Sequence, residues 1–224
     1  MGKIPRNANL PIGIVNKGTG PAIQENGVPT WRSRGYLPHF ESPYAIQHVT
    51  FHLADGLPQT VLQRFDAEIK FLPDAKRESE RRKRIDAWMD AGHGSCILRE
   101  PFIAFAVRQS LLNFNSQRYC LIAWVVMPNH VHVLFQSLNG WTVAKVVASW
   151  KKFTAGKICR HRRQLSEKDT GQVWHREYWD RYIRDDAHLA QVIEYIRMNP
   201  VKARLCAAPE SWPWSSASSG TPIS

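Results

Sequence analysis

The sequence predicts an α+β fold of ferredoxin-like type, in which helices pack on a small antiparallel sheet. Two kinds of pattern predict it. Residues 46–53, 118–127 and 129–136 are rich in β-branched and aromatic side chains, as strands are. Residues 142–162 and 186–199 carry apolar side chains at the three- and four-residue spacing of helices. No internal repeat is present, so these elements are expected to form one domain.

The N-terminal segment, residues 1–33, is rich in Gly, Pro and Asn and lacks periodicity, so we expect a flexible tail. The domain is expected to span residues 34–206. Residues 207–224 end in a serine-rich stretch and are expected to form a C-terminal tail. Within the domain the first strand, residues 46–53, leads into the turn-forming pair Asp55-Gly56.

Three helices are predicted between the first two strands. Residues 59–72 have helical apolar spacing, a strongly charged helix follows over about 76–91, and another runs over about 101–114. The sequence therefore predicts a helical elaboration over about 73–117. The run Arg81-Arg82-Lys83-Arg84 in the charged helix is more typical of a solvated face than of a specific contact, although both interpretations stay open.

The second half of the chain is expected to complete the sheet. Strands 118–127 and 129–136 are joined through a Pro-Asn kink, and residues 179–184 suit a short strand. Asp185 is a good N-cap for the last helix, which Pro200 is expected to end. The helix over 142–162 is predicted to point five side chains inward: Val143, Val146, Val147, Trp150 and Phe153.

Composition points to a polyanionic partner. The chain has 224 residues, a formal net charge of +11 and nine tryptophans. Such an excess favours nucleic acid first and an anionic membrane surface second. Tryptophans among cations suit single-stranded nucleic acid, on whose bases they stack, although most of them are expected in the core.

Other features of the sequence indicate the cellular compartment of the protein. The four cysteines form no Cys-x-x-Cys pair, which favours reduced thiols in a cytoplasm over a zinc site or a disulfide framework. No signal peptide is visible, and no apolar run approaches the roughly 20 residues that span a membrane. We therefore expect a cytoplasmic protein that acts on nucleic acid without a membrane partner.

His130 and His132 are the most informative pair in the chain. Side chains alternate along a strand, so both imidazoles leave the same face of strand 129–136. Two imidazoles side by side can hold a divalent metal. A His-x-His pair taken alone is nevertheless more often structural than metal-binding, so at this point both interpretations stay open.

The last helix presents a second polar group. At about 100° per residue, His188, Tyr195 and Asn199 share a flank beside the apolar face, and Tyr195 and Asn199 are neighbours as i and i+4. A phenol and an amide are thus presented where the sheet can meet them. Asn199 can equally be a helix-ending residue before Pro200, and His188 has no assigned role.

A resemblance to a known family gives these residues roles. His130-Val131-His132 matches the His-hydrophobic-His motif of the HUH endonucleases. The longer string Met-Pro-Asn-His-Val-His-Val-Leu resembles the version in single-tyrosine transposases of bacterial insertion sequences. Four further strings are similar to the REP-associated tyrosine transposases: residues 34–40, 174–184, 195–203 and 212–216. The resemblance covers roughly residues 34–216.

The resemblance implies an HUH fold, ferredoxin-like or RRM-like, and a DNA-nicking site. Tyr195 corresponds to the nucleophile, His130 and His132 to ligands of Mg²⁺ or Mn²⁺, and Asn199 to the third ligand. It further implies a hairpin substrate from a repetitive extragenic palindrome and a 5′-phosphotyrosine intermediate. The family commonly has Gly where this chain has Arg204, a position that suits a left-handed helix end.

Basic residues around these motifs are the predicted DNA contacts. They lie on the helix over 142–162 and in the string 174–184: Lys151, Lys152, Lys157, Arg160, Arg176, Arg181 and Arg184. Phosphates pair with such side chains whatever the base sequence.

Two other enzyme classes are excluded by single positions. A histidine-triad hydrolase needs a third histidine where Leu134 stands, and the His-Glu-x-x-His motif of zinc hydrolases is absent. Two hypotheses remain. The first is an HUH single-tyrosine transposase that nicks and rejoins DNA as a monomer or homodimer. The second is a non-catalytic regulator that binds DNA hairpins and derives from a transposase.

Overall fold

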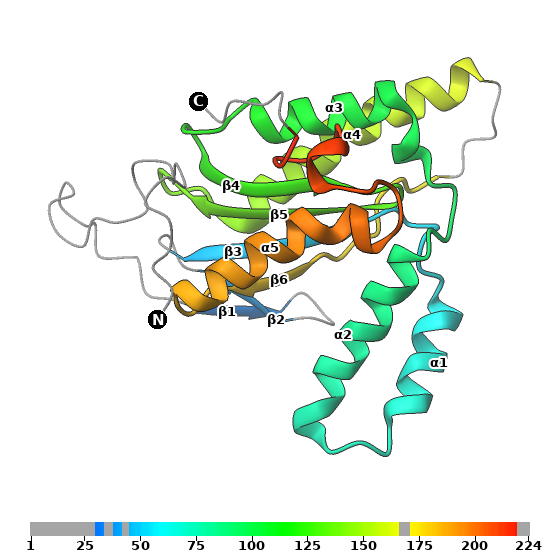
Figure 1. Ribbon diagram of the computed structural model, residues 1–224, viewed down its shortest axis with the longest axis vertical. Helices are drawn as coiled ribbons and strands as arrows, with labels where there is room; N and C mark the ends of the chain where they lie inside the picture. The colour runs from blue at the N-terminus through cyan, green and yellow to red at the C-terminus, as the bar shows by residue number, and fades with distance from the viewer. Residues whose placement is uncertain (1–29, 34–37, 42–44, 166–170, 219–224) are drawn as a thin grey trace, which may run out of the picture.

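The computed structural model describes residues 30–33, 38–41, 45–165 and 171–218. Its centre is a four-stranded antiparallel sheet in the order β4-β5-β3-β6 (Figure 1). The strands are β3 Ile46–His52, β4 Tyr119–Val126, β5 His130–Ser137 and β6 Trp179–Tyr182. With one helix packed on the sheet between β3 and β4 and another between β5 and β6, this order is the β-α-β-β-α-β arrangement of ferredoxin-like folds. The predicted fold class is confirmed.

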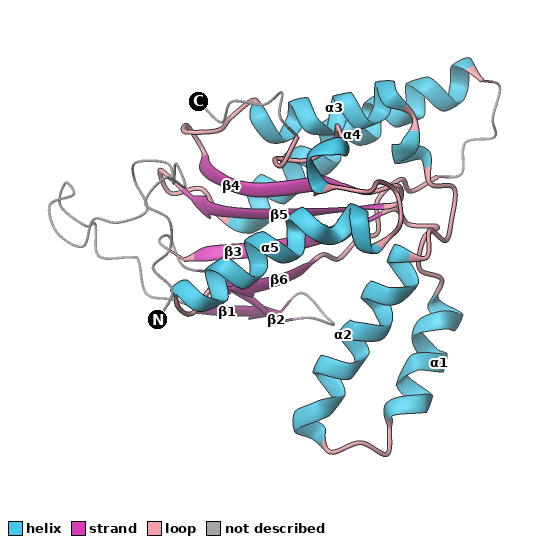
Figure 2. Ribbon diagram, viewed as in Figure 1, coloured by secondary structure: helices cyan, strands magenta, loops and turns pink. Residues whose placement is uncertain are grey.

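The two faces of the sheet are covered by different helices (Figure 2). On β5, Val131, Val133 and Phe135 point to the face under α3 (Pro101–Leu112) and α4 (Val143–Gln164). The opposite face, which carries His130 and His132, meets α5 (Asp186–Lys202). The strand alternation predicted from the sequence therefore separates a wholly apolar face from one where the two histidines lie beside an apolar cluster with α5.

A helical hairpin is inserted between β3 and α3. Its helices are α1 Gln59–Ile69 and α2 Asp74–Asp90, which project from the sheet as a separate arm (Figure 1). The insertion therefore begins earlier than predicted. Conversely α3, which was predicted to belong to the elaboration, is a core helix because Ile103, Val107 and Leu111 are fully buried against the sheet.

Segments at both ends of the domain add local pairing. β1 (Thr30–Ser33) and β2 (Pro38–Glu41) form a separate antiparallel pair, so the last residues of the segment expected to be a tail form a strand. The rest of that segment, residues 1–29, lies outside the described residues, as do 219–224 of the C-terminal tail.

Residues 212–216 cover the free edge of β4. The Val126 amide donates to the Trp214 carbonyl at 2.8 Å, and the Ser216 amide donates to the Trp124 carbonyl at 2.9 Å. The Trp212 indole N–H donates to the Val126 carbonyl at 3.0 Å. An edge strand exposes unpaired backbone groups, and this segment satisfies them. This part of the segment expected to be a tail therefore packs on the sheet.

Two local predictions are wrong. Pro200 does not end α5, which continues to Lys202, because Pro200 stands in the last turn, where its missing N–H and its ring disturb little of the helix. Phe153 was expected inside but is 50% exposed on α4, one turn beyond the buried Trp150.

Among the described residues, no helix has the length and apolar character that a membrane crossing requires.

Candidate active site

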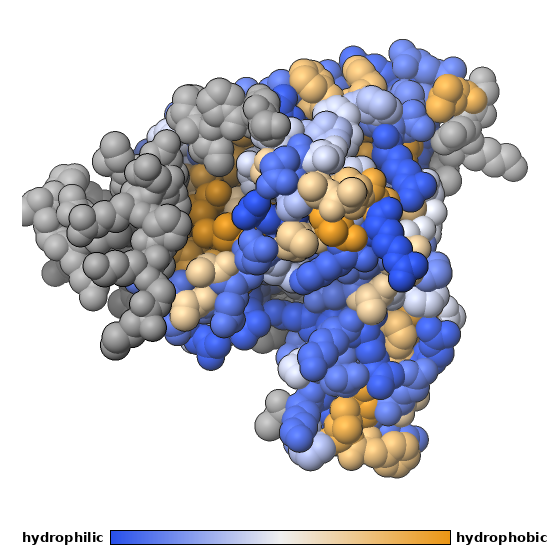
Figure 3. Space-filling view, in the orientation of Figure 1, coloured by the Kyte–Doolittle hydropathy of each residue, from blue (hydrophilic) through white to orange (hydrophobic). Residues whose placement is uncertain are grey.

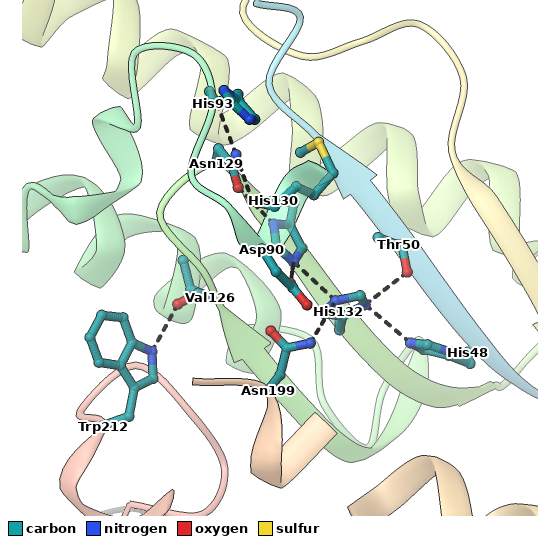
Figure 4. Close-up of polar contacts among 11 residues, drawn as sticks. His48, Thr50, Asp90, His93, Val126, Asn129, His130, His132, Asn199 and Trp212 are labelled. Atoms are coloured by element: carbon teal, nitrogen blue, oxygen red, sulfur yellow. Dashed lines mark hydrogen bonds and ion pairs between the residues drawn. The ribbon is translucent and has the colours of Figure 1, made fainter. Parts of the chain in front are cut away.

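His130 and His132 lie side by side on β5, in the interior of the protein. Their side chains are almost fully buried, and their Nε2 atoms are 3.0 Å apart (Figure 4). Two ligands about 2.1 Å from one ion, at a right angle, are also about 3 Å apart. The pair therefore has the spacing that a shared divalent ion requires.

Asn129 fixes the tautomer of His130. The Asn129 side-chain amide donates to the Met89 carbonyl at 3.1 Å and to the His93 carbonyl at 2.9 Å. Its oxygen is thereby left to accept from His130 Nδ1, which is 2.7 Å away. With the proton on Nδ1, His130 presents a lone pair on Nε2. A hydrogen bond of this kind is how proteins orient a metal-binding imidazole.

His132 is held by the neighbouring strand β3. Its Nδ1 lies 2.8 Å from Thr50 Oγ1 and 3.3 Å from His48 Nε2. Burial lowers the pKa of His130 to about 3, and it also holds the pKa of His132 well below its usual range; neighbouring histidines add to both shifts. Both imidazoles are therefore neutral at physiological pH, which is the form that binds metals.

Helix α5 brings Tyr195 and Asn199 to the histidines. Asn199 is fully buried, and its Nδ2 is 3.5 Å from His132 Nε2. The Asn199 Oδ1 is buried and accepts no hydrogen bond from the described residues. The Tyr195 ring packs edge-on against His132, with 5.3 Å between ring centroids. The flank predicted from helix geometry thus meets the His pair within one chain.

The Tyr195 hydroxyl sits in a low-dielectric, acidic environment. Its oxygen is buried and makes no hydrogen bond of normal geometry with the described residues, although Asn199 is nearby. Burial raises the pKa of Tyr195 well above its usual range, and the carboxylates of Asp86 and Asp90 raise it further. Lys202, which α5 reaches only because it continues past Pro200, places its ammonium 5.3 Å from the centre of the Tyr195 ring.

Asp86 and Asp90 were missed by the sequence analysis. Both come from α2 of the inserted hairpin, and Asp90 Oδ1 lies 3.7 Å from His130 Nε2 (Figure 4). The pKa of each carboxyl is raised to about 6, by burial in both cases and, for Asp86, also by the charge of Asp90. One pattern hinted at this position: each carboxylate directly follows an apolar residue that α2 buries, Ile85 or Met89.

A cavity of about 240 Å³ opens beside the Tyr195 ring. Its lining comes from α2, β3, β5, β6 and α5, and includes Arg82, Arg181, His188 and Asp86.

The structure also divides the basic run of α2, Arg81-Arg82-Lys83-Arg84, between two environments. Arg81 pairs with Asp66, and Arg84 pairs with Glu68 and Glu80, whereas the Arg82 charge acts on His48, Asp86 and Tyr195. The run is thus partly a solvated, paired face and partly a wall of the cavity.

The predicted DNA contacts are separated by the sheet. Arg181 lines the cavity and Arg184 follows it at the end of β6. Lys152, Lys157 and Arg160 lie on α4, which covers the opposite face. Arg176 is exposed in the loop before β6.

The Lys151 ammonium is hydrogen-bonded within the protein. Its ammonium donates to the carbonyls of His175, Arg176 and Glu177 at 3.0–3.3 Å, which uses its three N–H donors. Burial lowers the pKa of Lys151 to about 8. We therefore leave Lys151 out of the proposed DNA-binding surface.

The donors present fit a hard divalent ion. Among residues 45–165 and 171–218, no three His, Cys, Asp or Glu side chains form a ready-made metal cluster. The site instead combines two neutral imidazoles with the buried, unpaired oxygens of Asn199 and Asp90. The amide and carboxylate oxygens suit Mg²⁺ or Mn²⁺, whereas imidazoles also bind Zn²⁺ and Fe²⁺, so the donor set fits the predicted ions without selecting them over other divalent metals.

Comparison with known proteins agrees with these motifs. Residues 105–199 match the family model described as "Transposase IS200 like". That region contains the His pair, Tyr195 and Asn199. The resemblance inferred from the sequence is confirmed.

Two individual proteins are similar to this chain. A protein of Haemophilus influenzae described as "Putative REP-associated tyrosine transposase" is 32% identical over 101 residues, which cover 42% of this chain and 57% of that protein. A solved structure described as "Structure of the REP associates tyrosine transposase bound to a REP hairpin" has 15% identity and a TM-score of 0.48, over 81% of each chain.

Proposed function

We propose that this protein is a metal-dependent single-stranded DNA endonuclease and strand transferase that acts on hairpin DNA. One observation carries the proposal: Tyr195 and Asn199 of α5 meet His132 of β5 within one chain, with 5.3 Å between the Tyr195 and His132 rings. A nucleophile beside a candidate metal-binding pair is the arrangement that phosphodiester transfer requires. The proposed site needs no second subunit.

The proposed chemistry divides between the ion and the side chains. A divalent ion supplies charge neutralisation for the scissile phosphate. His130, His132 and Asn199 hold the ion beside Tyr195. The Tyr195 oxygen attacks phosphorus, a bond from tyrosine to the 5′-phosphate forms, and the P–O bond to the 3′ oxygen breaks. The hydroxyl proton leaves the tyrosine, and the released 3′ oxygen gains a proton, which gives a free 3′-OH.

The reverse attack by a 3′-OH rejoins the strand, so no nucleotide triphosphate is consumed. The ester bond energy is kept in the phosphotyrosine. The buried position of Tyr195 excludes water from this intermediate, which otherwise hydrolyses. The same burial requires that the cavity admits the substrate phosphate before reaction.

Charge around the cavity supports a nucleic-acid substrate. Arg82 and Arg181 line it from opposite elements, α2 and β6, so a phosphate entering beside Tyr195 passes between two guanidinium groups. Arg184, at the end of β6, extends this basic wall. We infer hairpin DNA as the substrate because the similar Haemophilus protein is described as REP-associated and the similar solved structure is bound to a REP hairpin.

A covalent-adduct assay tests the proposal. Purified protein is incubated with Mn²⁺ and labelled oligonucleotides that carry a hairpin and an unpaired flank, and the adduct is resolved on a denaturing gel. We expect wild type and the control Tyr182→Phe, a change of an exposed tyrosine on β6, to form the adduct. Tyr195→Phe should lose it completely while hairpin binding changes little. An adduct of normal yield in Tyr195→Phe would falsify the assignment.

The same assay distinguishes the enzyme from a non-catalytic regulator. It also shows whether Tyr195 acts within its own chain or in a partner subunit. Tight hairpin binding by wild type without cleavage in Mn²⁺ identifies the non-catalytic regulator instead. Mixing Tyr195→Phe with His132→Ala subunits restores no adduct if each chain uses its own tyrosine. Recovery of adduct in the mixture would show that the tyrosine acts across a homodimer.

A further inference from the structure

We propose that Asp90 of the inserted hairpin is an additional ligand of the divalent ion. The ion is then held by β5, by α5 and by α2, an element outside the β-α-β-β-α-β unit. This inference rests on the proposed function, because it assumes that His130 and His132 bind metal. It adds a carboxylate and a negative charge to a ligand set that the sequence limited to two imidazoles and an amide.

Geometry is the first argument. Asp90 Oδ1 lies 3.7 Å from His130 Nε2, the atom that also faces His132 Nε2 at 3.0 Å (Figure 4). Two donors on one ion are separated by about 3 Å when their bonds are at right angles and about 2.1 Å long. A small change in the Asp90 side-chain torsions closes the difference. His130 Nε2 therefore faces both His132 Nε2 and Asp90 Oδ1.

Hydrogen bonding is the second argument. Asn129 keeps the proton of His130 on Nδ1, so His130 Nε2 points a lone pair toward the Asp90 carboxylate. Two acceptors that face each other repel unless a cation or a proton lies between them. Asp90 Oδ1 is also buried and accepts no hydrogen bond from the described residues, which is unfavourable for a carboxylate oxygen. A metal ion satisfies both atoms.

The third argument is that α2 is anchored at the residue in question. The Asn129 amide donates to the carbonyls of Met89 and His93, on either side of Asp90. Just beyond, Gly94 has a φ of +91°, and a Cβ there would lie 2.9 Å from the Gly56 Cα. The end of the hairpin is therefore fixed to the strand that carries His130, so Asp90 is positioned rather than merely close.

Metal affinity tests the inference without any reaction. Mn²⁺ binding to the full chain is measured by calorimetry for wild type, Asp90→Asn, Asp86→Asn and His132→Ala. Asp86 is the charge control, because it is one turn earlier on the same helix and has the same raised pKa. Replacing the charged carboxylate by a neutral, weaker amide donor at a ligand position should weaken Mn²⁺ binding in Asp90→Asn about 10–100-fold. Loss of a nearby charge alone should weaken binding in Asp86→Asn only about three-fold in screened surroundings.

A spectroscopic count of the waters bound to Mn²⁺ distinguishes a ligand role of Asp90 from a purely structural role. Line broadening of the Mn²⁺ EPR signal by ¹⁷O-water reports how many waters the ion keeps, and thermal melting of each variant reports its folding. In Asp90→Ala, water takes the vacated position, so the bound ion should gain one water. An unchanged water count, or equal affinity of Asp90→Asn and Asp86→Asn, overturns the role of Asp90. If His132→Ala binds Mn²⁺ as wild type does, it is the proposed metal site itself that fails.

Discussion

The same strand contributes to two very different surfaces. On one face of β5, Phe135 packs edge-to-face against Tyr119 and Trp150 among fully buried apolar side chains. On the other face, His130 and His132 are just as buried but meet polar groups. Orphaned polar atoms accumulate there, including Asn199 Oδ1, Asp90 Oδ1 and Tyr195 Oη. The apolar face holds the strand rigid, and the polar face uses that rigidity to keep unsatisfied donors and acceptors together.

The molecular surface shows a similar division. The visible side of the α1–α2 hairpin is mostly hydrophilic, with an apolar patch at its free end, where the chain turns and Phe71 is 84% exposed (Figure 3). The opposite end of α2 carries Asp90 to the histidines. The hairpin therefore has one end committed to the site and another that is exposed to solvent.

Acid should affect the polar face most. The folded-state pKa values of His52 and His130 are lowered from 6.5 to about 3 by burial, and that of His132 is lowered too. The unfolded chain then binds more protons below pH 6.5, so stability is present above that pH and is lost as pH falls. Each histidine should cost about 2 kcal/mol between pH 7 and pH 5. Urea unfolding in metal-free buffer measures this loss.

A double variant tests which histidines are responsible. His130→Gln with His132→Gln should lose about 4 kcal/mol less than wild type over the same pH range, because two of the titrating groups are gone. Equal losses in the two proteins would mean that these imidazoles are already protonated in the fold.

The apolar face should be destabilised by shortening a buried side chain rather than by a change of pH. Phe135→Ala removes a fully buried ring and should lower the free energy of unfolding by about 3–5 kcal/mol. Phe153→Ala is the matched control, because that ring is half exposed on α4, and it should cost less than about 1 kcal/mol. Similar losses in both variants would contradict the placement of α4. Urea unfolding at pH 7 compares them.

Local pattern was sufficient for much of this architecture. Strand alternation predicted that His130 and His132 share a face, and the helical angle predicted that Tyr195 and Asn199 share a flank, because both depend only on backbone periodicity. The contribution of Asp90 was not predictable in this way. It depends on how an inserted hairpin docks, which Asn129 decides through carbonyls about forty residues away. The backbone contacts of Lys151 were not predictable for a related reason, since a loop distant in sequence supplies the carbonyls that accept from it.

Asp86 gives a smaller effect of opposite pH sign. Its folded-state pKa is raised from 3.8 to about 6, so the folded protein binds more protons between these values and stability falls as pH rises through that window. Asp86→Asn removes the penalty. After discounting for partial exposure, the variant should be about 1–2 kcal/mol more stable than wild type at pH 8 and equal to it near pH 4. A gain that is the same at both pH values would assign the effect to packing rather than to charge.

The smallest predicted effect lies where α5 ends, just beyond the polar face. The Arg204 amide donates to Val201 O, the Leu205 amide donates to Pro200 O, and Arg204 has a φ of +57°, which together form a Schellman end. The left-handed position that the sequence indicated for glycine is therefore present, and arginine occupies it at a steric cost.

Arg204→Gly should relieve that strain and raise the free energy of unfolding by about 0.5–1 kcal/mol, because part of the gain is lost to the greater freedom of glycine in the unfolded chain. Arg197→Gly, inside the same helix, should instead destabilise by about 1 kcal/mol. Thermal unfolding of the two variants measures the difference. If Arg204→Gly is also destabilising, the Arg204 side chain makes contacts that outweigh its backbone strain, and the end of α5 is held by that side chain rather than by its hydrogen bonds.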